Sequence, residues 1–163
     1  MAQSFDTFED DTKFYRYMRF ETTLGDIVLL ASYDEMTAGL REATQIFMQN
    51  FGSQMFSHIK HRDSFVMIGQ KGIPKGKAIE KHEHKIKAFA EAAEISGCVQ
   101  FPLGVINEVK KNEMQVNNLD KIVVSKVVKN CGLRETCKND EFPVHVYSGI
   151  NQDDEPMICV DGK

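Results

Sequence analysis

The cysteines place the strongest constraint on how this 163-residue chain can fold. There are four of them, at positions Cys98, Cys131, Cys137 and Cys159. An even number suits a disulfide framework, although four reduced thiols in a cytosolic protein would be expected about as often. Three of the four lie after residue 130, in a segment with few large apolar side chains. Because such a segment gains most from a covalent link, we expect the cysteines to be oxidised.

The composition and charge exclude several classes of protein. The net charge of −4 creates no basic field that would attract nucleic acid. The longest apolar run, residues 27–31, is far shorter than the roughly 20 residues that span a bilayer. The first residues contain no basic segment followed by an apolar stretch, so no signal peptide is visible. The chain is therefore either cytosolic or lacks its beginning.

Several segments have the sequence pattern of β-strands. Residues 27–33 and 64–69 are continuous apolar runs of strand length, which predicts strands buried on both faces. Apolar and polar residues alternate at 4–8, which is typical of a strand end, and again at 142–147. Residues 157–160 predict a further strand before a turn.

Helices are predicted by apolar residues recurring at intervals of three and four. A short helix is expected over residues 10–21, and an amphipathic helix over residues 40–51 with Gly52 as its C-terminal stop. Residues 77–94 are highly charged and indicate a solvated segment, part helix and part loop. Residues 102–129 show no packing pattern and are interpreted as a connector.

Histidines suggest a metal site only at first sight. They occur as two close pairs, at His58 and His61 and at His82 and His84. Zinc needs three or four ligands that converge at about 2.0–2.3 Å, and nothing in the sequence brings the two pairs together. We therefore expect solvated histidines, no metal ligand and no cofactor.

Enzyme signatures are also weak. The glycines between Gly69 and Gly76, followed by Lys77, superficially match a phosphate loop, but Ala78 replaces the hydroxyl that would hold magnesium. No nucleophile signature surrounds Cys98, and no acid–base pair is evident. The sequence therefore predicts no catalytic residue and a protein that is not an enzyme.

One polar group of residues fits a binding site. Asp34 and Glu35 follow the first apolar run, and Arg62 and Asp63 precede the second. If the two strands are neighbours, all four side chains could reach one edge of the sheet. Carboxylates together with a guanidinium suit a sugar or peptide ligand. The competing interpretation is an Arg–Asp pair that only orders the two loops.

Beyond these patterns, the chain resembles the ILEI/PANDER-like domain family over about residues 3–98. The resemblance lies in the motifs at residues 4–7, 27–35, 51–53, 61–73 and 97–98. The family includes interleukin-like EMT inducer and pancreatic-derived factor. Related domains occur in the stem of protein O-mannose N-acetylglucosaminyltransferase and in a hyaluronan-binding protein.

The C-terminal tail resembles the beginning of the same domain, in swapped order. The motifs lie at residues 131–137, 142–149 and 156–159. We therefore predict that residues 3–104 form the back two thirds of one domain. Residues 105–128 then form a connector, and residues 129–163 begin a second domain. The chain is either a fragment of a tandem protein or a circular permutant, and two missing strands favour the fragment.

The resemblance implies specific disulfides. Cys131 would pair with Cys159 inside the tail, whereas Cys98 and Cys137 would pair only if both find each other within this chain. These pairs would form a disulfide-stapled C-terminal lobe.

The resemblance also implies a fold and a function. The expected fold class is α/β, a lectin-like sandwich of mostly antiparallel strands with short helices, incomplete at one edge. The implied function is a non-catalytic, secreted or lumenal interaction module, cytokine-like or protein-binding. A carbohydrate-binding module, free or accessory to a glycan-processing protein, is the alternative. The partner would be an extracellular receptor or a glycan, and an open sheet edge would allow self-association.

Overall fold

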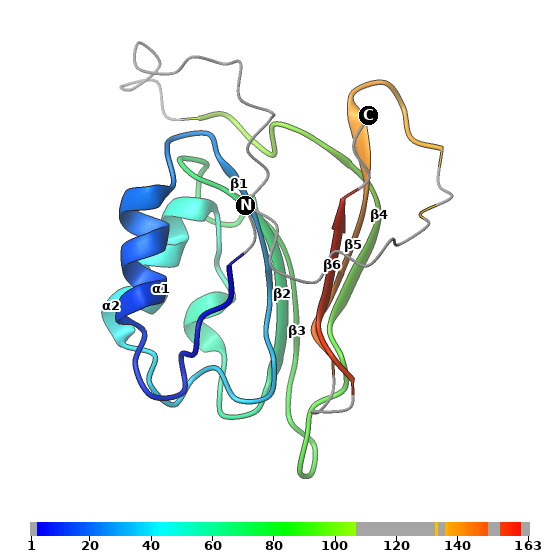
Figure 1. Cartoon of the computed structure of the whole chain (residues 1–163). Helices are drawn as coiled ribbons and strands as arrows, with labels where there is room; N and C mark the ends of the chain where they lie inside the picture. The colour runs from blue at the N-terminus through cyan, green and yellow to red at the C-terminus, as the bar shows by residue number, and fades with distance from the viewer. Residues whose placement is uncertain (1–2, 107–132, 134–135, 150–153, 161–163) are drawn as a thin grey trace.

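The computed structural model describes residues 3–106, 133, 136–149 and 154–160 (Figure 1). Six strands in this part of the chain form two antiparallel sheets of three strands each. The first sheet has the order β1-β2-β3, with bounds Ile27–Ala31, Ser64–Gln70 and Ile79–Glu83. The second has the order β4-β5-β6, with bounds Glu94–Gln100, Glu141–Tyr147 and Met157–Val160.

Short helices complete the fold. They are α1 (Thr12–Arg16), continued by a π-helical turn (Tyr17–Glu21), then α2 (Glu42–Phe47), continued by a 3₁₀ turn (Met48–Phe51), and a 3₁₀ turn at Phe56–His58. Figure 1 shows that the helices cover one face of the β1-β2-β3 sheet, while the β4-β5-β6 sheet lies on its other face. The described residues therefore form three layers.

Strand β2 lies in the middle of these layers and is buried along its whole length. Phe65 and Met67 pack toward the helices, and Val66 and Ile68 pack toward the second sheet. Because successive side chains of a strand point to opposite faces, a strand covered on both sides needs apolar residues at every position. Burial on both faces therefore explains why residues 64–69 form a continuous apolar run.

The second sheet is built from distant parts of the chain. Strand β4 pairs with β5 along its full length, from Glu94 opposite Tyr147 to Gln100 opposite Glu141. Val144 and Val146 of β5 then pack in the same core cluster as Val66 of β2. The tail and the preceding body thus share one hydrophobic core.

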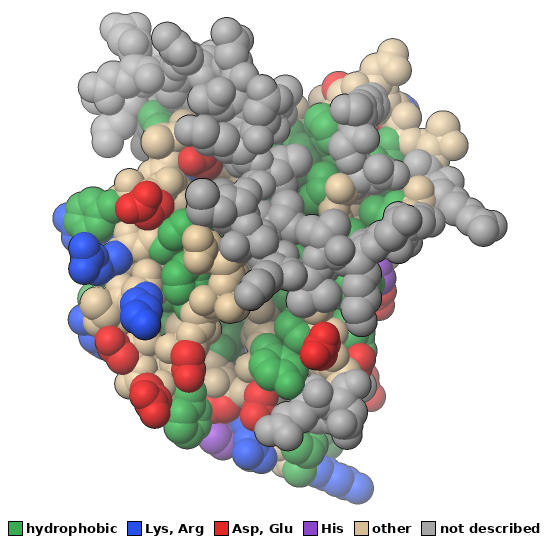
Figure 2. All heavy atoms as spheres, in the orientation of Figure 1, with side chains coloured by type: hydrophobic (Ala, Val, Ile, Leu, Met, Phe, Trp, Pro, Cys, Tyr) green, Lys and Arg blue, Asp and Glu red, His purple; other side chains and the backbone are tan. Residues whose placement is uncertain are grey.

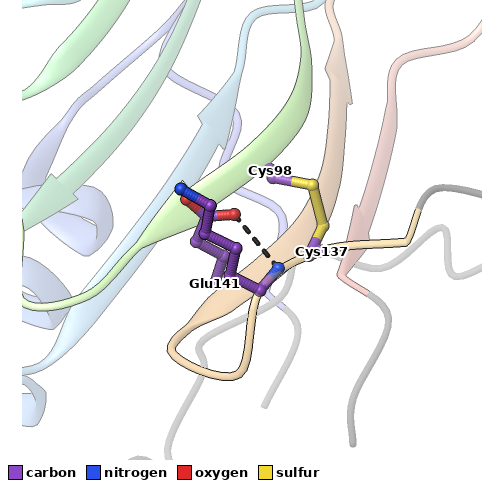
Figure 3. Close-up of a disulfide and its surroundings, with 4 residues drawn as sticks. Cys98, Cys137 and Glu141 are labelled. Atoms are coloured by element: carbon purple, nitrogen blue, oxygen red, sulfur yellow. Dashed lines mark hydrogen bonds between the residues drawn. A yellow bond between two sulfur atoms is a disulfide. The ribbon is translucent and has the colours of Figure 1, made fainter.

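A disulfide fixes this pairing. Cys98 of β4 is bonded to Cys137, which precedes β5 (Figure 3). In the turn between Cys137 and β5, the Lys138 amide donates a hydrogen bond to the Glu141 carboxylate at 3.2 Å. Cys159 is also disulfide-bonded, and its predicted partner, Cys131, lies outside the described residues. The conditional Cys98–Cys137 pair is therefore confirmed.

Most predicted elements are confirmed, with two corrections. Residues 4–8 do not form a strand, because they lie against the helices as an irregular segment and a turn. Within the segment at 77–94, predicted as solvated helix and loop, residues 79–83 form strand β3. The Glu80 carboxylate there accepts hydrogen bonds from the Gln54 amide at 3.0 Å and from the Ser53 hydroxyl. In the sequence, a charged side chain that bonds to a neighbouring loop cannot be told apart from one that is solvated, so the strand was missed.

The predicted α/β class, with antiparallel strands in a sandwich and short helices, is confirmed. No helix in the described residues has the length and apolar character needed to cross a membrane. Figure 2 shows basic and acidic side chains together over the helical layer, in agreement with the small net charge.

Two isoleucine substitutions test the packing of the second sheet. Ile158 of β6 is 2% exposed in the core between the sheets, whereas Ile86 is 78% exposed. We expect Ile158→Ala to lower the free energy of unfolding by about 2–5 kcal/mol, because it leaves a cavity. Ile86→Ala should change it by less than about 0.5 kcal/mol. Urea unfolding of the oxidised chain measures both values, and equal costs would contradict the packing described here.

Candidate functional site

The predicted polar group lies at the sheet edge where β1 ends and β2 begins. The two strands are antiparallel neighbours, with Ala31 opposite Val66, so the loops that carry Asp34 and Arg62 meet at this edge. The sequence analysis required the two strands to be neighbours, and the structure shows that they are. The geometry of the four predicted residues, however, divides them into two groups.

Asp34, Glu35 and Arg62 border a cavity of about 920 Å³. Its walls come from the N-terminal segment, the π-helical turn and β1, and most of the lining side chains are apolar. Glu155 and Pro156, which precede β6, close one side, so the tail contributes to the cavity. This volume lies within the range of small-molecule and peptide-side-chain sites, about 300–1,000 Å³.

Glu35 organises the rim of the cavity. Its side chain is buried, and its Oε2 accepts a hydrogen bond from the Arg62 amide at 2.7 Å and contacts the His61 ring. Its Oε1 accepts hydrogen bonds from the amide and the hydroxyl of Thr37, both at 2.5 Å. Burial by itself raises the pKa of Glu35, but the hydrogen bonds from Thr37 and Arg62 outweigh it, so the pKa lies below its ordinary value.

The backbone is strained at two of the predicted residues. Asp34 has φ 50° and Arg62 has φ 58°, and these are the non-glycine residues with positive φ in the described part of the chain. A left-handed conformation is uncommon for a long side chain such as arginine and costs on the order of 1–3 kcal/mol. The Glu35 hydrogen bond to the Arg62 amide holds this conformation. Strain of this kind concentrates at functional sites.

The Arg62 side chain is only partly satisfied. Its guanidinium carbon lies 5.4 Å from the centre of the Phe89 ring, and Phe89 is 43% exposed. Its Nε is buried and has no hydrogen-bond partner among the described residues. A buried donor without a partner is costly, which adds to the strain at Arg62. Sequence reasoning missed Phe89, because nothing in its charged surroundings indicates a partner.

Asp63 faces the opposite way, toward β3. Its Oδ1 accepts a hydrogen bond from the Lys85 amide at 2.9 Å, and its Oδ2 accepts one from the Lys60 amide at 2.9 Å and contacts the rings of His82 and His84. Burial alone raises the pKa of Asp63, but these hydrogen bonds lower it to about 2. The competing interpretation, an Arg–Asp pair that only orders the two loops, stays open, and the Glu35 carboxylate already joins the two loops through the Arg62 amide.

His82 and His84 were expected to be solvated, and for His82 this is wrong. Its side chain is 9% exposed, and its Nε2 lies 2.7 Å from Asp63 Oδ2. The two histidines are separated by one residue and therefore share a face of the strand. Recognising residues 79–83 as a strand would have placed the two histidines on one face, but the pairing that brings Asp63 to them is not visible in the sequence.

Comparisons with known proteins support the resemblance over the first part of the chain. The family model described as interleukin-like EMT inducer matches residues 1–73, which contain all four predicted site residues. Protein FAM3A of Homo sapiens is 32% identical over 81 residues, and protein FAM3C of Xenopus tropicalis is 31% identical over 81 residues. Each of these alignments covers 46% of this chain and 35% of the relative.

A longer alignment reaches further along the chain. Protein FAM3C of Danio rerio is 26% identical over 104 residues, covering 60% of this chain and 46% of the relative. The chain thus spans between about a third and a half of the length of these curated relatives. No solved structure matches the chain.

Acid unfolding should report the Asp63 hydrogen bonds. Because the pKa of Asp63 is lowered from 3.8 to about 2, its contribution to stability is complete above about pH 4 and is lost as the pH falls to about 2. This contribution amounts to about 2 kcal/mol. We therefore expect Asp63→Asn to flatten the pH dependence of the free energy of unfolding in this range.

The control is Asp34→Asn, which removes the same charge at an exposed position. Urea unfolding at a series of pH values, with a chelator present, measures the slope for each variant. A wild-type slope retained in Asp63→Asn would contradict the assignment.

Proposed function

We propose that this chain is a non-catalytic interaction module of the extracellular space or the secretory lumen, and that it binds a protein partner at the cavity beside Arg62. The match of residues 1–73 to the interleukin-like EMT inducer family supports a cytokine-like, signalling-type role. The local structure of Arg62 supports the placement of the binding site here. It has a strained backbone, a buried donor without a partner among the described residues, and an exposed aromatic neighbour.

The oxidised cysteines support a location in the extracellular space or the secretory lumen. Disulfides persist in secreted and lumenal proteins and are rare in reducing compartments. Cys98 and Cys137 form a disulfide, and Cys159 is disulfide-bonded as well. Cys159 is 2% exposed in the second sheet. A chain built around such bonds would be less stable in a reducing compartment.

The state of the buried carboxylates at positions 35 and 63 supports binding over catalysis. A carboxylic acid that transfers protons near neutral pH needs a raised pKa. The pKa values of Glu35 and Asp63 are both lowered, and their oxygens are occupied by backbone and side-chain donors. These groups act as anchors for the backbone.

We also infer that the tail and the body work as one unit. Glu155 and Pro156 line the cavity, and β5 pairs with β4 of the body. This arrangement supports the alternative in which both family segments complete a single domain, as in a circular permutant. The boundaries at 3–104, 105–128 and 129–163 stay a prediction.

Self-association through an open sheet edge also stays a prediction. The β3 edge exposes Lys81 and Glu83, and charges on an edge strand disfavour pairing with another chain. The other sheet edges, at β1, β4 and β6, are the better candidates.

A carbohydrate ligand is the second candidate, and the pair formed by Arg62 and Phe89 favours it. An exposed aromatic face beside a guanidinium can stack against a sugar ring while donating hydrogen bonds to its hydroxyls. Asp34 borders the same cavity and could accept hydrogen bonds from further hydroxyls. On this view, a glycan would occupy the same rim as a protein ligand.

Binding of labelled, oxidised chain to cultured cells tests the proposal. We expect saturable binding that is lost when surface proteins are removed by protease and that survives glycosidase treatment. Arg62→Ala should weaken it by at least about 10-fold, because central charged contacts of an interface carry much of its affinity. Arg62→Gly, which also relieves the positive φ, should weaken binding equally without loss of stability. Arg16→Ala, at an exposed position of α1, is the matched control.

The outcomes separate the candidates. Binding that is lost after glycosidase treatment, together with Arg62-dependent signals on a glycan array, would favour the carbohydrate ligand. Undiminished binding of Arg62→Ala, with the fold intact by circular dichroism, would overturn the placement of the site at Arg62.

A further inference from the structure

Three metal-ligating side chains converge on the far side of the Arg62 loop. They are Asp63, directly before β2, His82 of β3 and His84, directly after β3. Asp63 Oδ2 lies 2.7 Å from His82 Nε2 and 3.2 Å from His84 Nδ1, and all three ligand atoms lie within 4.8 Å of one another. Among the described residues, these three side chains are close enough together to hold one metal ion.

The topology explains the convergence. Strands β2 and β3 pair with Ser64 opposite Glu83, so the register continued by one residue places Asp63 opposite His84. His82 shares the strand face of His84, because side chains alternate along a strand. The three residues are thus brought together by the pairing of the two strands.

We propose that Asp63, His82 and His84 form a binding site for a divalent transition-metal ion, with Zn²⁺ as the best fit. Two neutral imidazoles and one carboxylate are a donor set that suits zinc. This proposal goes beyond the proposed function and does not depend on it, because none of the three residues lines the cavity.

The two separations from Asp63 Oδ2 are close to those around a tetrahedral ion. Bonds of about 2.0–2.1 Å from zinc to nitrogen and oxygen place neighbouring ligand atoms about 3.3 Å apart. The Asp63–His84 separation of 3.2 Å already has this value, and the Asp63–His82 separation of 2.7 Å needs to widen by roughly 0.6 Å. The ion would replace the hydrogen-bonded protons between the carboxylate and the two rings.

The site is both held in place and accessible. The Lys85 and Lys60 amides hold the two Asp63 oxygens at 2.9 Å each, which fixes the carboxylate as outer hydrogen bonds do in metal sites. The His84 side chain is 69% exposed, so an ion could enter from solvent. A water molecule or a donor from a partner would complete the coordination.

A purely structural role for the cluster leaves one feature unexplained. His82 and the two backbone amides already bond the Asp63 carboxylate in the turn before β2. The exposed His84 ring adds little stability as a surface pair, yet it approaches the same oxygen, Oδ2. A shared metal ion gives a reason for both rings to converge there.

Titration of the metal-stripped, oxidised full chain with Zn²⁺ tests the proposal, by isothermal titration calorimetry. Co²⁺ serves as a spectroscopic probe, since its visible absorption reports tetrahedral coordination. We expect one ion per chain and an affinity at least about 10-fold lower in His84→Ala, because loss of a ligand should cost no less than loss of an outer contact. His84 is exposed, so this variant should keep its fold.

His61→Ala is the matched control. His61 is likewise an exposed histidine beside a buried carboxylate, Glu35, but no third ligand joins them among the described residues. We expect wild-type Zn²⁺ affinity and an unchanged Co²⁺ spectrum in this variant. The absence of saturable binding, equal affinity in wild type and His84→Ala, or an equal loss in His61→Ala would overturn the proposal.

Discussion

The pairing of β4 with β5 is the constraint on which the rest of the structure depends. It joins the tail to the body of the chain, and the Cys98–Cys137 disulfide holds the two strands in register. Without the second sheet, Val66 and Ile68 of β2 would lose the apolar partners that cover them. In the chain-entropy model, a disulfide that closes a loop of 39 residues stabilises the fold by about 4 kcal/mol.

Buried and half-buried carboxylates fix the loops around this core. Glu35 holds the Arg62 amide, Asp63 holds the Lys60 and Lys85 amides, and Glu80 holds the Gln54 amide. As a result, the loop from His61 to Asp63 presents two different surfaces. Arg62 borders the cavity on one side, and Asp63 meets the histidines of β3 on the other.

Sequence patterns predicted the parts of the fold that depend on burial. The runs at 27–33 and 64–69 are apolar because β1 and β2 are covered, and the helix stop at Gly52 has φ 85° as a C-cap requires. Strand β3 was missed because its charged side chains make contacts at an edge, which leaves no apolar alternation. The site was predicted in part. Asp34, Glu35 and Arg62 border one cavity, and their role in binding stays a prediction, whereas the turn of Asp63 toward His82 depends on strand pairing that the sequence does not reveal.

One disulfide-linked sandwich unites the body and the tail of the chain. Peptide mapping under non-reducing conditions, on protein prepared from its native compartment, tests it most directly. We expect a linked pair of peptides that contain Cys98 and Cys137, and no free thiol at Cys159. Four free cysteines, or a Cys98 peptide linked to a different cysteine, would contradict it.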